Sequence, residues 1–342
     1  MRGTAIAPPT DTAPHAANAG TAADGIVVVD KPAGWTSHDV VARMRRIAGT
    51  RRVGHAGTLD PMATGVLVVG IGRATRLLGH ISGHSKAYTA TIRLGWATVT
   101  DDAEGDRLAG DAADHLTMAD VLPAVEELTG AILQRPSAVS AIKVDGRRAH
   151  DRVRAGEEVE LAERPVLVSI FDVLAVRPDH DRSCLDLDVE VECSSGTYIR
   201  ALARDLGQAL GVGGHLTSLR RTRVGGFDVT EARTLVELGR ERDDRGGLEV
   251  LGLADAAASA FPVVAVPGPV ESAIRHGRAI TLPRVWEPFR DVWHENGTEG
   301  SEGTWADHVE PHALFSEFGE FLALVSPNQD GTTRYVAVFA QP

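Results

Sequence analysis

The sequence predicts an α+β protein built around a mixed, mostly antiparallel β-sheet, with a small β-rich domain at the C-terminal end. Apolar and polar residues alternate over Lys86–Gly95 and, more strictly, over Leu185–Cys193, as in strands that bury one face. Apolar residues recur at helical spacing in other stretches, such as residues 37–47 and 199–210. Residues 259–342 contain four short apolar runs, which predict the second domain.

The length and composition are typical of a globular protein with more than one domain. The 342 residues are 43% hydrophobic and 24% charged, and a chain of this length suggests two domains. Residues 1–24 are rich in Ala, Thr, Pro and Gly without a hydrophobic period, and we expect them to form a disordered tail. The large domain is therefore placed at 25–258 and the small one at 259–342.

Several absences in the sequence narrow the class of protein. The two cysteines, Cys184 and Cys193, indicate a reducing compartment without disulfides, and the lack of a second pair argues against a zinc site. No apolar run reaches the ~18 residues of a membrane span. The N-terminus lacks the apolar core of a signal peptide. We expect a cytoplasmic protein.

The net charge is unevenly distributed along the chain. Its total of −12 argues at first against RNA binding. Residues 284–320, however, carry nine acidic side chains against two arginines, a net charge of −7, and are interpreted as a mobile acidic insertion in the small domain. Arginines cluster elsewhere, where they can hold phosphates on an acidic protein; the clusters lie in residues 43–52, 147–154 and 220–223.

The first elements are predicted from local signals. Residues 25–29 are β-branched and predict a strand, and Ser37 is a good N-cap for a helix over the following residues. The apolar run 66–69 predicts a buried strand. Gly70 and Gly72 after it match part of a dinucleotide-binding pattern, but the third glycine and the acidic residue about 20 positions on are absent. The helix near 77–81 is therefore expected only to pack on the sheet.

The later elements follow from similar patterns. Strand 86–95 leads to an acidic turn at 100–106, which lacks the length of a calcium loop. Thr117 and Asp120 resemble a capping box for a helix that ends at Gly130. Residues 134–168 show little core periodicity and many basic side chains. A helix follows strand 185–193 and closes at Gly211. Strands expected in the small domain are 261–264, 279–282, 321–325 and 335–339.

One glycine-rich stretch holds a single carboxylate in a setting suited to catalysis. It reads Gly54-His55-Ala56-Gly57-Thr58-Leu59-Asp60-Pro61-Met62-Ala63-Thr64-Gly65-Val66-Leu67. The glycines permit tight turns, and Pro61 disfavours helical geometry at Asp60. Asp60 is expected on a rigid loop before a buried strand, where a nucleophile or base would be pre-positioned. The alternative is a structural turn in which Asp60 caps a neighbour.

This stretch closely resembles the G-H-x-G-x-L-D-P-x-A-x-G-x-L signature of the TruB family of pseudouridine synthases, which isomerise a uridine in the T loop of tRNA. Residues 31–37 and 196–200 also resemble motifs of that family. The resemblance implies the pseudouridine synthase fold with a PUA-like C-terminal domain, action at position 55 of tRNA, and Asp60 as the catalytic residue. No cofactor is expected, because the reaction is an isomerisation without net redox change.

The resemblance also implies roles for other residues. Tyr88 supplies the ring on which the flipped base stacks, and His55 occupies the space that the base vacates. Tyr198 is an active-site tyrosine, and Arg200 pairs with Asp60. Residues 134–168 resemble a thumb-like insertion that grips the tRNA T arm, with backbone contacts from Lys143, Arg147 and Arg148. We expect no metal and no obligatory protein partner, and we expect the protein to be a monomer. Attack on C1′, attack on C6 and a glycal route all stay open.

Three other functions have partial support in the sequence, and a fourth has none. A silent RNA-binding module or tRNA-folding chaperone on the same fold would need the basic insertion but not Asp60 or Arg200. An RNA-guided pseudouridylase would need partner proteins, whereas this chain has its own insertion. A nucleotide-binding dehydrogenase would have to use Gly70 and Gly72. A zinc base deaminase is excluded, because its H-x-E and P-C-x-x-C motifs are missing.

Overall fold

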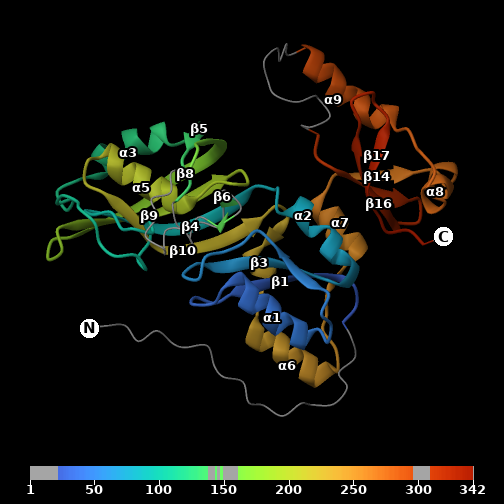
Figure 1. The fold of residues 1–342 in the computed structure, drawn as a ribbon, viewed down its shortest axis with the longest axis horizontal. Helices are drawn as coiled ribbons and strands as arrows, with labels where there is room; N and C mark the ends of the chain where they lie inside the picture. Colours follow the sequence, from blue (N-terminus) through green and yellow to red (C-terminus); the bar gives the residue numbers. More distant parts are fainter. Residues whose placement is uncertain (1–21, 138–142, 145–146, 149–160, 296–308, 342) are drawn as a thin grey trace.

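The computed structural model describes residues 22–137, 143–144, 147–148, 161–295 and 309–341. Two folded parts are visible in Figure 1: a long curved sheet with its helices, and a smaller β-rich unit that carries the C-terminus. Within the described residues the main sheet has 11 strands in a mixed, mostly antiparallel arrangement. The predicted fold class is therefore confirmed.

The main sheet has the strand order β12-β1-β3-β10-β4-β9-β8-β5, with β2, β11 and β13 attached at its side. The parallel pairs are β1 with β12 and β3 with β10, and the other pairs are antiparallel. The strands are β1 (Gly25–Lys31), β2 (Val53–Ala56), β3 (Thr64–Ile71), β4 (Lys86–Leu94), β5 (Gly130–Gln134), β8 (Arg164–Asp179), β9 (Cys184–Cys193), β10 (Gly214–Val224), β11 (Phe227–Asp228), β12 (Arg233–Thr234) and β13 (Leu251–Gly252).

Helices cover the sheet where its strands carry apolar residues: these alternate along β9, whereas β1 and β3 are buried on both faces. The inward residues of β4 and β9 pack with α3 and α5 in one core, while one face of β1 and β3 packs with α1 and α6 in another. Figure 1 shows these two helix pairs over different parts of the curved sheet. The helices are α1 (Ser37–Ile47), η1 (Gly72–Arg76), α2 (Leu78–Ile81), α3 (Met118–Glu127), α5 (Ile199–Ala209), η2 (Val229–Glu231), α6 (Leu235–Arg245) and α7 (Leu253–Ala260).

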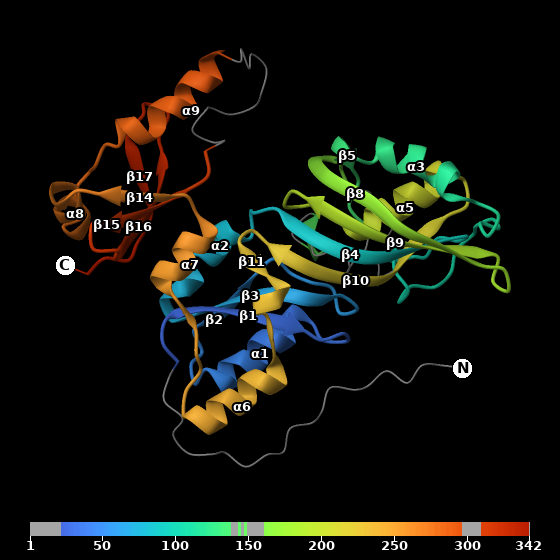
Figure 2. The same ribbon diagram turned by 180° about the vertical axis from the view of Figure 1, so that it is seen from behind.

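The C-terminal unit is a four-stranded sheet in the order β14-β15-β16-β17. Figure 2 shows it beside α2 and α7, on the side of the molecule away from α3. Phe315, Phe321 and Phe339 join a core shared with β1 and α7, and Arg76 donates to the Val338 carbonyl at 2.7 Å. Its elements are β14 (Val263–Val266), α8 (Gly268–Arg275), α9 (Pro283–Glu295), β15 (His312–Ser316), β16 (Phe321–Pro327) and β17 (Thr333–Val338).

The prediction that residues 284–320 form a single acidic insertion is wrong. Its beginning lies in α9, whose Trp286 is 1% exposed and donates a hydrogen bond from Nε1 to Thr333 at 2.9 Å. Its later part contains β15, which pairs with both β14 and β16. The charge count concealed these elements because α9 carries acidic residues beside its buried Trp286, while β15 (HALFS) is buried throughout and contains no acidic residue. Residues 296–308 lie outside the described residues.

Three further expectations need correction. Residues 279–282 form no strand; they precede α9, although Ile280 is buried in the same core as Trp286. The helix begun by the Thr117 capping box ends at Glu127, and Gly130 instead starts β5. The N-cap of α1 is Thr36, which forms the capping box with Asp39. The Ser37 hydroxyl instead exchanges hydrogen bonds with the Leu59 backbone.

The predicted basic insertion begins and ends in the main sheet. Gln134 is the last residue of β5, and Arg164–Val168 is the start of β8, so the two ends pair with each other. Between them, β6 (Lys143–Val144) and β7 (Arg147–Arg148) form an antiparallel pair. The candidate RNA-backbone residues Lys143, Arg147 and Arg148 thus lie on two paired strands. Residues 138–142, 145–146 and 149–160 lie outside the described residues.

Candidate active site

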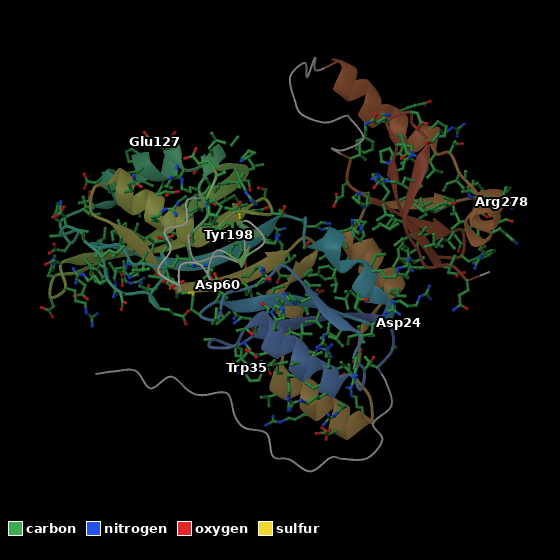
Figure 3. The ribbon with its side chains drawn as sticks, in the orientation of Figure 1. Asp24, Trp35, Asp60, Glu127, Tyr198 and Arg278 are labelled. Carbon is green, nitrogen blue, oxygen red and sulfur yellow. The ribbon has the colours of Figure 1, made fainter. Side chains whose placement is uncertain are left out.

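Four of the predicted site residues line one pocket of about 300 Å³. Asp60 comes from the loop between β2 and β3, Tyr88 from β4, and Tyr198 and Arg200 from the start of α5. Figure 3 shows Asp60 and Tyr198 in the same region of the molecule, at the middle of the long sheet. The tertiary structure thus brings together residues from three distant parts of the chain.

The loop that carries Asp60 is held by hydrogen bonds on both sides. Pro61 offers its carbonyl to the Gly34 N–H at 2.8 Å and to the Lys31 ammonium at 3.1 Å. Leu59 donates its N–H to the Ser37 hydroxyl at 2.9 Å, and that hydroxyl donates back to the Leu59 carbonyl at 3.1 Å. The backbone on each side of Asp60 is therefore fixed to the segment that leads into α1.

Glycine is required where this loop enters β3. Gly65 has φ +93°, and a Cβ there would lie 2.1 Å from the Arg221 carbonyl oxygen. Any other residue would combine a strained backbone with a collision against β10. Gly65 pairs with Arg221 of β10 at this point, and Arg221 lines the same pocket as the Asp60 loop.

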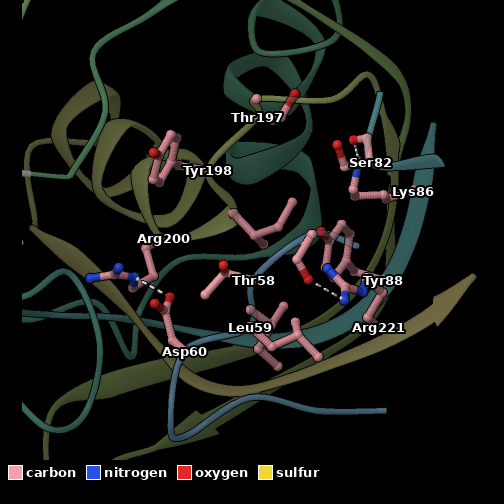
Figure 4. Close-up of a pocket in the computed structure, with 14 residues that line it drawn as sticks. Thr58, Leu59, Asp60, Ser82, Lys86, Tyr88, Thr197, Tyr198, Arg200 and Arg221 are labelled. Carbon is pink, nitrogen blue, oxygen red and sulfur yellow. Dashed lines mark hydrogen bonds and ion pairs between the residues drawn. The ribbon is translucent and has the colours of Figure 1, made fainter. Parts of the chain in front are cut away.

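Asp60 forms an ion pair with Arg200 at the edge of the pocket. Arg200 Nε lies 2.9 Å from Asp60 Oδ2, and the Asp60 side chain remains 40% exposed, so it stays accessible to a substrate. The buried Arg200 also lies 3.4 Å from Asp102 Oδ2 and donates to the Thr100 carbonyl at 2.8 Å. Figure 4 shows the guanidinium directed at the Asp60 carboxylate. The guanidinium is therefore fixed from behind by the loop after β4.

The opposite side of the pocket combines an aromatic ring with two cations, as Figure 4 shows. Arg221 is buried and donates to the carbonyls of Val66 at 2.8 Å and Gly57 at 2.9 Å. Lys86 donates to the carbonyls of Ser82 and His84 at 2.9 and 2.8 Å. Burial, and secondarily the Arg221 charge, lower the pKa of Lys86 to about 8. Burial also raises the pKa of Tyr88, so its phenol stays protonated.

His55 lies beside the pocket rather than in its lining. It is on β2, its Nε2 is 3.3 Å from the Thr58 hydroxyl, and its ring lies 5.6 Å from that of His38 in an edge-to-face contact. Thr58 itself lines the pocket. Burial lowers the pKa of His55, assisted by the charges of His38 and Arg221. A neutral imidazole next to the pocket is suited to contact a nucleobase.

Sequence reasoning missed several residues that build the site. Asp102 was read only as part of an acidic turn, and Ser37 only as a helix cap. Arg221 was counted in a phosphate-binding cluster, but it is buried, while Arg220 pairs with Asp30 at 2.9 Å and Arg223 with Glu192 at 2.7 Å. That cluster therefore serves the fold. Motif spacing could not reveal these partners, because each lies far away in the chain.

The structure also argues against a dinucleotide site at Gly70 and Gly72. A Cβ at Gly72 would lie 1.7 Å from Asp24 Oδ1, and this carboxylate accepts the Arg73 N–H at 2.9 Å. The position where a pyrophosphate would meet a helix N-terminus is thus filled by an acidic side chain. The helices that follow are short: η1 has five residues and α2 has four.

Among the described residues, no helix is both long enough and apolar enough to cross a membrane.

Family models match most of the larger domain. Residues 45–199 match the TruB family pseudouridylate synthase N-terminal domain, and residues 200–246 match the tRNA pseudouridylate synthase B C-terminal domain. The second match ends before the β-rich unit that we predicted as the C-terminal domain. The described strands β14 to β17 all lie beyond it.

Individual relatives match over three quarters of the chain or more. A protein from Arthrobacter sp. (strain FB24) named tRNA pseudouridine synthase B is 54% identical over 92% of this chain and 96% of its own. One of the same name from Rhodococcus jostii (strain RHA1) is 59% identical over 76% of this chain and 84% of its own. A solved Cbf5-Nop10-Gar1 complex contains a chain that is 26% identical, with a TM-score of 0.65, covering 93% of this chain and 84% of the other.

Proposed function

The chain belongs to the TruB family of pseudouridine synthases, and from this we propose that it isomerises the uridine at position 55 in the T loop of tRNA with Asp60 as the catalytic residue. The observation that carries the proposal is the Asp60–Arg200 ion pair at 2.9 Å, at the edge of a pocket of about 300 Å³. Such a volume is at the lower end for small-ligand sites.

The isomerisation breaks the N1–C1′ bond, turns the base and joins C5 to C1′. It consumes no redox equivalent, so the proposal includes no cofactor. In this proposal Asp60 acts on C1′ or C6, or as a base toward C2′. The hydrogen bonds that fix its loop at Leu59 and Pro61, and its accessible carboxylate, support this role. The positive charge of Arg200 stabilises the ionised carboxylate that each of these routes requires.

The target base must leave its stack to reach the pocket. Flipping costs a few kcal/mol, and stacking on an aromatic ring returns about 1–3 kcal/mol. We assign that ring to Tyr88, which lines the pocket opposite Asp60, and we assign Tyr198 to the pocket wall. His55 lies beside the pocket, where it can fill the place that the base vacates in the RNA.

We assign binding of the RNA backbone to the basic insertion, residues 134–168. Lys143, Arg147 and Arg148 lie on the paired strands β6 and β7, the strands that follow β5 in the sequence. Phosphate contacts of this kind supply affinity without reading the sequence. In this proposal, these three residues bind the RNA backbone, whereas Asp60 and Arg200 carry out the chemistry.

The proposed enzyme acts as a monomer in the cytoplasm and needs no protein partner. An RNA-guided enzyme is the main alternative, since a chain in the Cbf5-Nop10-Gar1 complex shares the fold. The relatives named tRNA pseudouridine synthase B support the tRNA enzyme instead, because their identity of 54–59% is about twice the 26% of the Cbf5 chain.

The test compares wild-type protein with Asp60→Asn on a uridine-containing T-arm stem-loop. Asn keeps the shape of Asp but is neither a nucleophile nor a base, so pseudouridine formation should fall by at least about 10⁴-fold. RNA binding should persist, because phosphate contacts supply most of the affinity. Turnover by uncontaminated Asp60→Asn would falsify the catalytic assignment. Wild-type protein that binds the RNA but makes no pseudouridine would favour the chaperone.

A further inference from the structure

Gln134 forms a pair of hydrogen bonds with one residue of the active site. It is the last residue of β5, and the residue is 2% exposed. Its Oε1 accepts the Tyr198 N–H at 2.8 Å, and its Nε2 donates to the Tyr198 carbonyl at 3.2 Å. Only one orientation of the amide satisfies both backbone groups. The side chain thus holds Tyr198 as a neighbouring strand would.

The residue held in this way begins the helix that carries Arg200. Tyr198 is the N-cap of α5, has an extended backbone (φ −105°, ψ 109°), and has no side-chain capping hydrogen bond. Its carbonyl also accepts the Leu202 N–H at 3.1 Å, the first hydrogen bond of the helix. Arg200 is the second residue of α5. The position of its guanidinium relative to Asp60 therefore depends on where the Tyr198 backbone is held.

A second contact joins the same two elements one helical turn further on. Arg204 donates from Nη2 to the Arg135 carbonyl at 2.7 Å and lies 3.2 Å from Asp101 Oδ2. Asp101 precedes Asp102, which pairs with Arg200 at 3.4 Å. The end of β5, the first turns of α5 and the loop after β4 therefore form one connected polar cluster. The only member of this cluster that reaches Asp60 directly, among the described contacts, is Arg200.

We propose that Gln134 is a positioning residue for the isomerisation: its amide fixes the Tyr198 backbone, and this places Arg200 on the Asp60 carboxylate. The proposal rests on the proposed function, in which Asp60 performs the chemistry. Gln134 does not itself line the pocket, and its described side-chain contacts are with Tyr198, so its effect must pass through α5. A displacement of about 1 Å in a catalytic group can cost about 10²-fold in rate.

The experiment compares Gln134→Met with the matched control Gln208→Met. Met has nearly the volume of Gln but makes neither hydrogen bond, and Gln208 is an exposed residue of the same α5. Single-turnover rates with saturating enzyme on the T-arm stem-loop separate chemistry from binding. We expect Gln134→Met to lower the rate by about 10- to 100-fold and to leave the dissociation constant of the RNA within about twofold. Gln208→Met should match wild type.

A double-mutant cycle tests whether Gln134 affects catalysis through Arg200. If Gln134 acts through Arg200, Gln134→Met should cost less than about threefold in an Arg200→Lys background, because coupled residues are not additive. Full multiplication of the two effects would overturn the route through Arg200. The further variant Gln134→Glu keeps the acceptor for Tyr198 N–H but loses the donor to its carbonyl, and an intermediate rate is expected.

The remaining outcomes are distinguishable. If Gln134→Met keeps the wild-type rate, the positioning role is overturned while the proposed function stands. If both Gln134 variants lose the fold, as judged by circular dichroism and thermal unfolding, the residue is structural and the proposal fails. If the wild-type protein makes no pseudouridine in this RNA, the proposed function itself fails.

Discussion

Adjacent residues at the start of α1 are predicted to have different effects when changed to alanine. Ser37 exchanges hydrogen bonds with the N–H and carbonyl of Leu59, the residue before Asp60. Thr36 instead caps the helix, through its bond with the N–H of Asp39 at 3.1 Å. Ser37→Ala should therefore impair both stability and catalysis, whereas Thr36→Ala should affect stability alone.

The magnitudes follow from burial. Leu59 is 4% exposed, so Ser37→Ala leaves its N–H without water or another partner, at a cost of about 1–3 kcal/mol. Thr36 is exposed, and loss of an N-cap costs about 1 kcal/mol. If a displaced loop relieves about 1.4 kcal/mol of the cost at Leu59, the competent loop is populated about one tenth of the time. The single-turnover rate of Ser37→Ala should then fall about tenfold.

The assay uses urea unfolding for stability and single-turnover conversion of the T-arm stem-loop, with saturating enzyme, for catalysis. Thr36→Ala is expected to lose about 1 kcal/mol and to keep the wild-type rate. The reasoning is refuted if Ser37→Ala loses stability but keeps its full rate. It is also refuted if Thr36→Ala slows conversion as much as Ser37→Ala does.

Three other predictions concern regions away from the Asp60 loop. Arg147→Ala with Arg148→Ala should weaken tRNA binding and reduce its salt dependence, by a slope of about 1 per lost phosphate contact; a large stability loss with unchanged binding would contradict this. Trp286→Ala should lower the unfolding free energy by about 3–5 kcal/mol, whereas Phe289→Ala, 43% exposed on the same helix, should cost far less; equal effects in urea titrations would show that α9 does not pack as described. The pKa of Lys86 is about 8 in the folded protein and 10.5 ordinarily. Between these two pH values the unfolded chain therefore holds a proton that the folded chain has lost. The free energy of unfolding should rise with pH over this range, by up to about 1.4 kcal/mol per pH unit. The stability difference between wild type and Lys86→Met should change steadily over this range, in favour of wild type as the pH rises, and a constant difference would contradict the assignment.

The acidic segment illustrates how composition can mislead. Nine acidic residues between 284 and 320 predicted an insertion, yet the structure places Trp286 in the core of the C-terminal unit and makes β15 an inner strand of its sheet. A count of charged side chains does not report whether the apolar residues between them are buried. Deleting residues 286–318 should therefore disrupt the C-terminal unit rather than remove a dispensable segment.

The features that depend on residues close together in the chain were predictable from the amino-acid sequence. Strands 86–94 and 184–193 were predictable because alternation reports one buried face. The fixed loop around Asp60 was predictable because glycine and proline restrict the backbone locally, and helix 199–209 because its apolar residues share a face. The resemblance to the family rests on equally short stretches, and it singles out Asp60, Tyr88, Tyr198 and Arg200 as candidate site residues, which line one pocket in the structure.

Contacts between residues far apart in the chain could not be predicted without the fold. Ser37 finds Leu59 across 22 positions, and Gln134 finds Tyr198 across 64. Arg221 became a buried support of the loop rather than a phosphate ligand. Each outcome depends on which strands pair and on the depth at which a polar side chain is buried. A buried polar group needs a hydrogen-bond partner, which the fold can supply from any part of the chain. The local pattern of apolar residues does not indicate which residue that partner is.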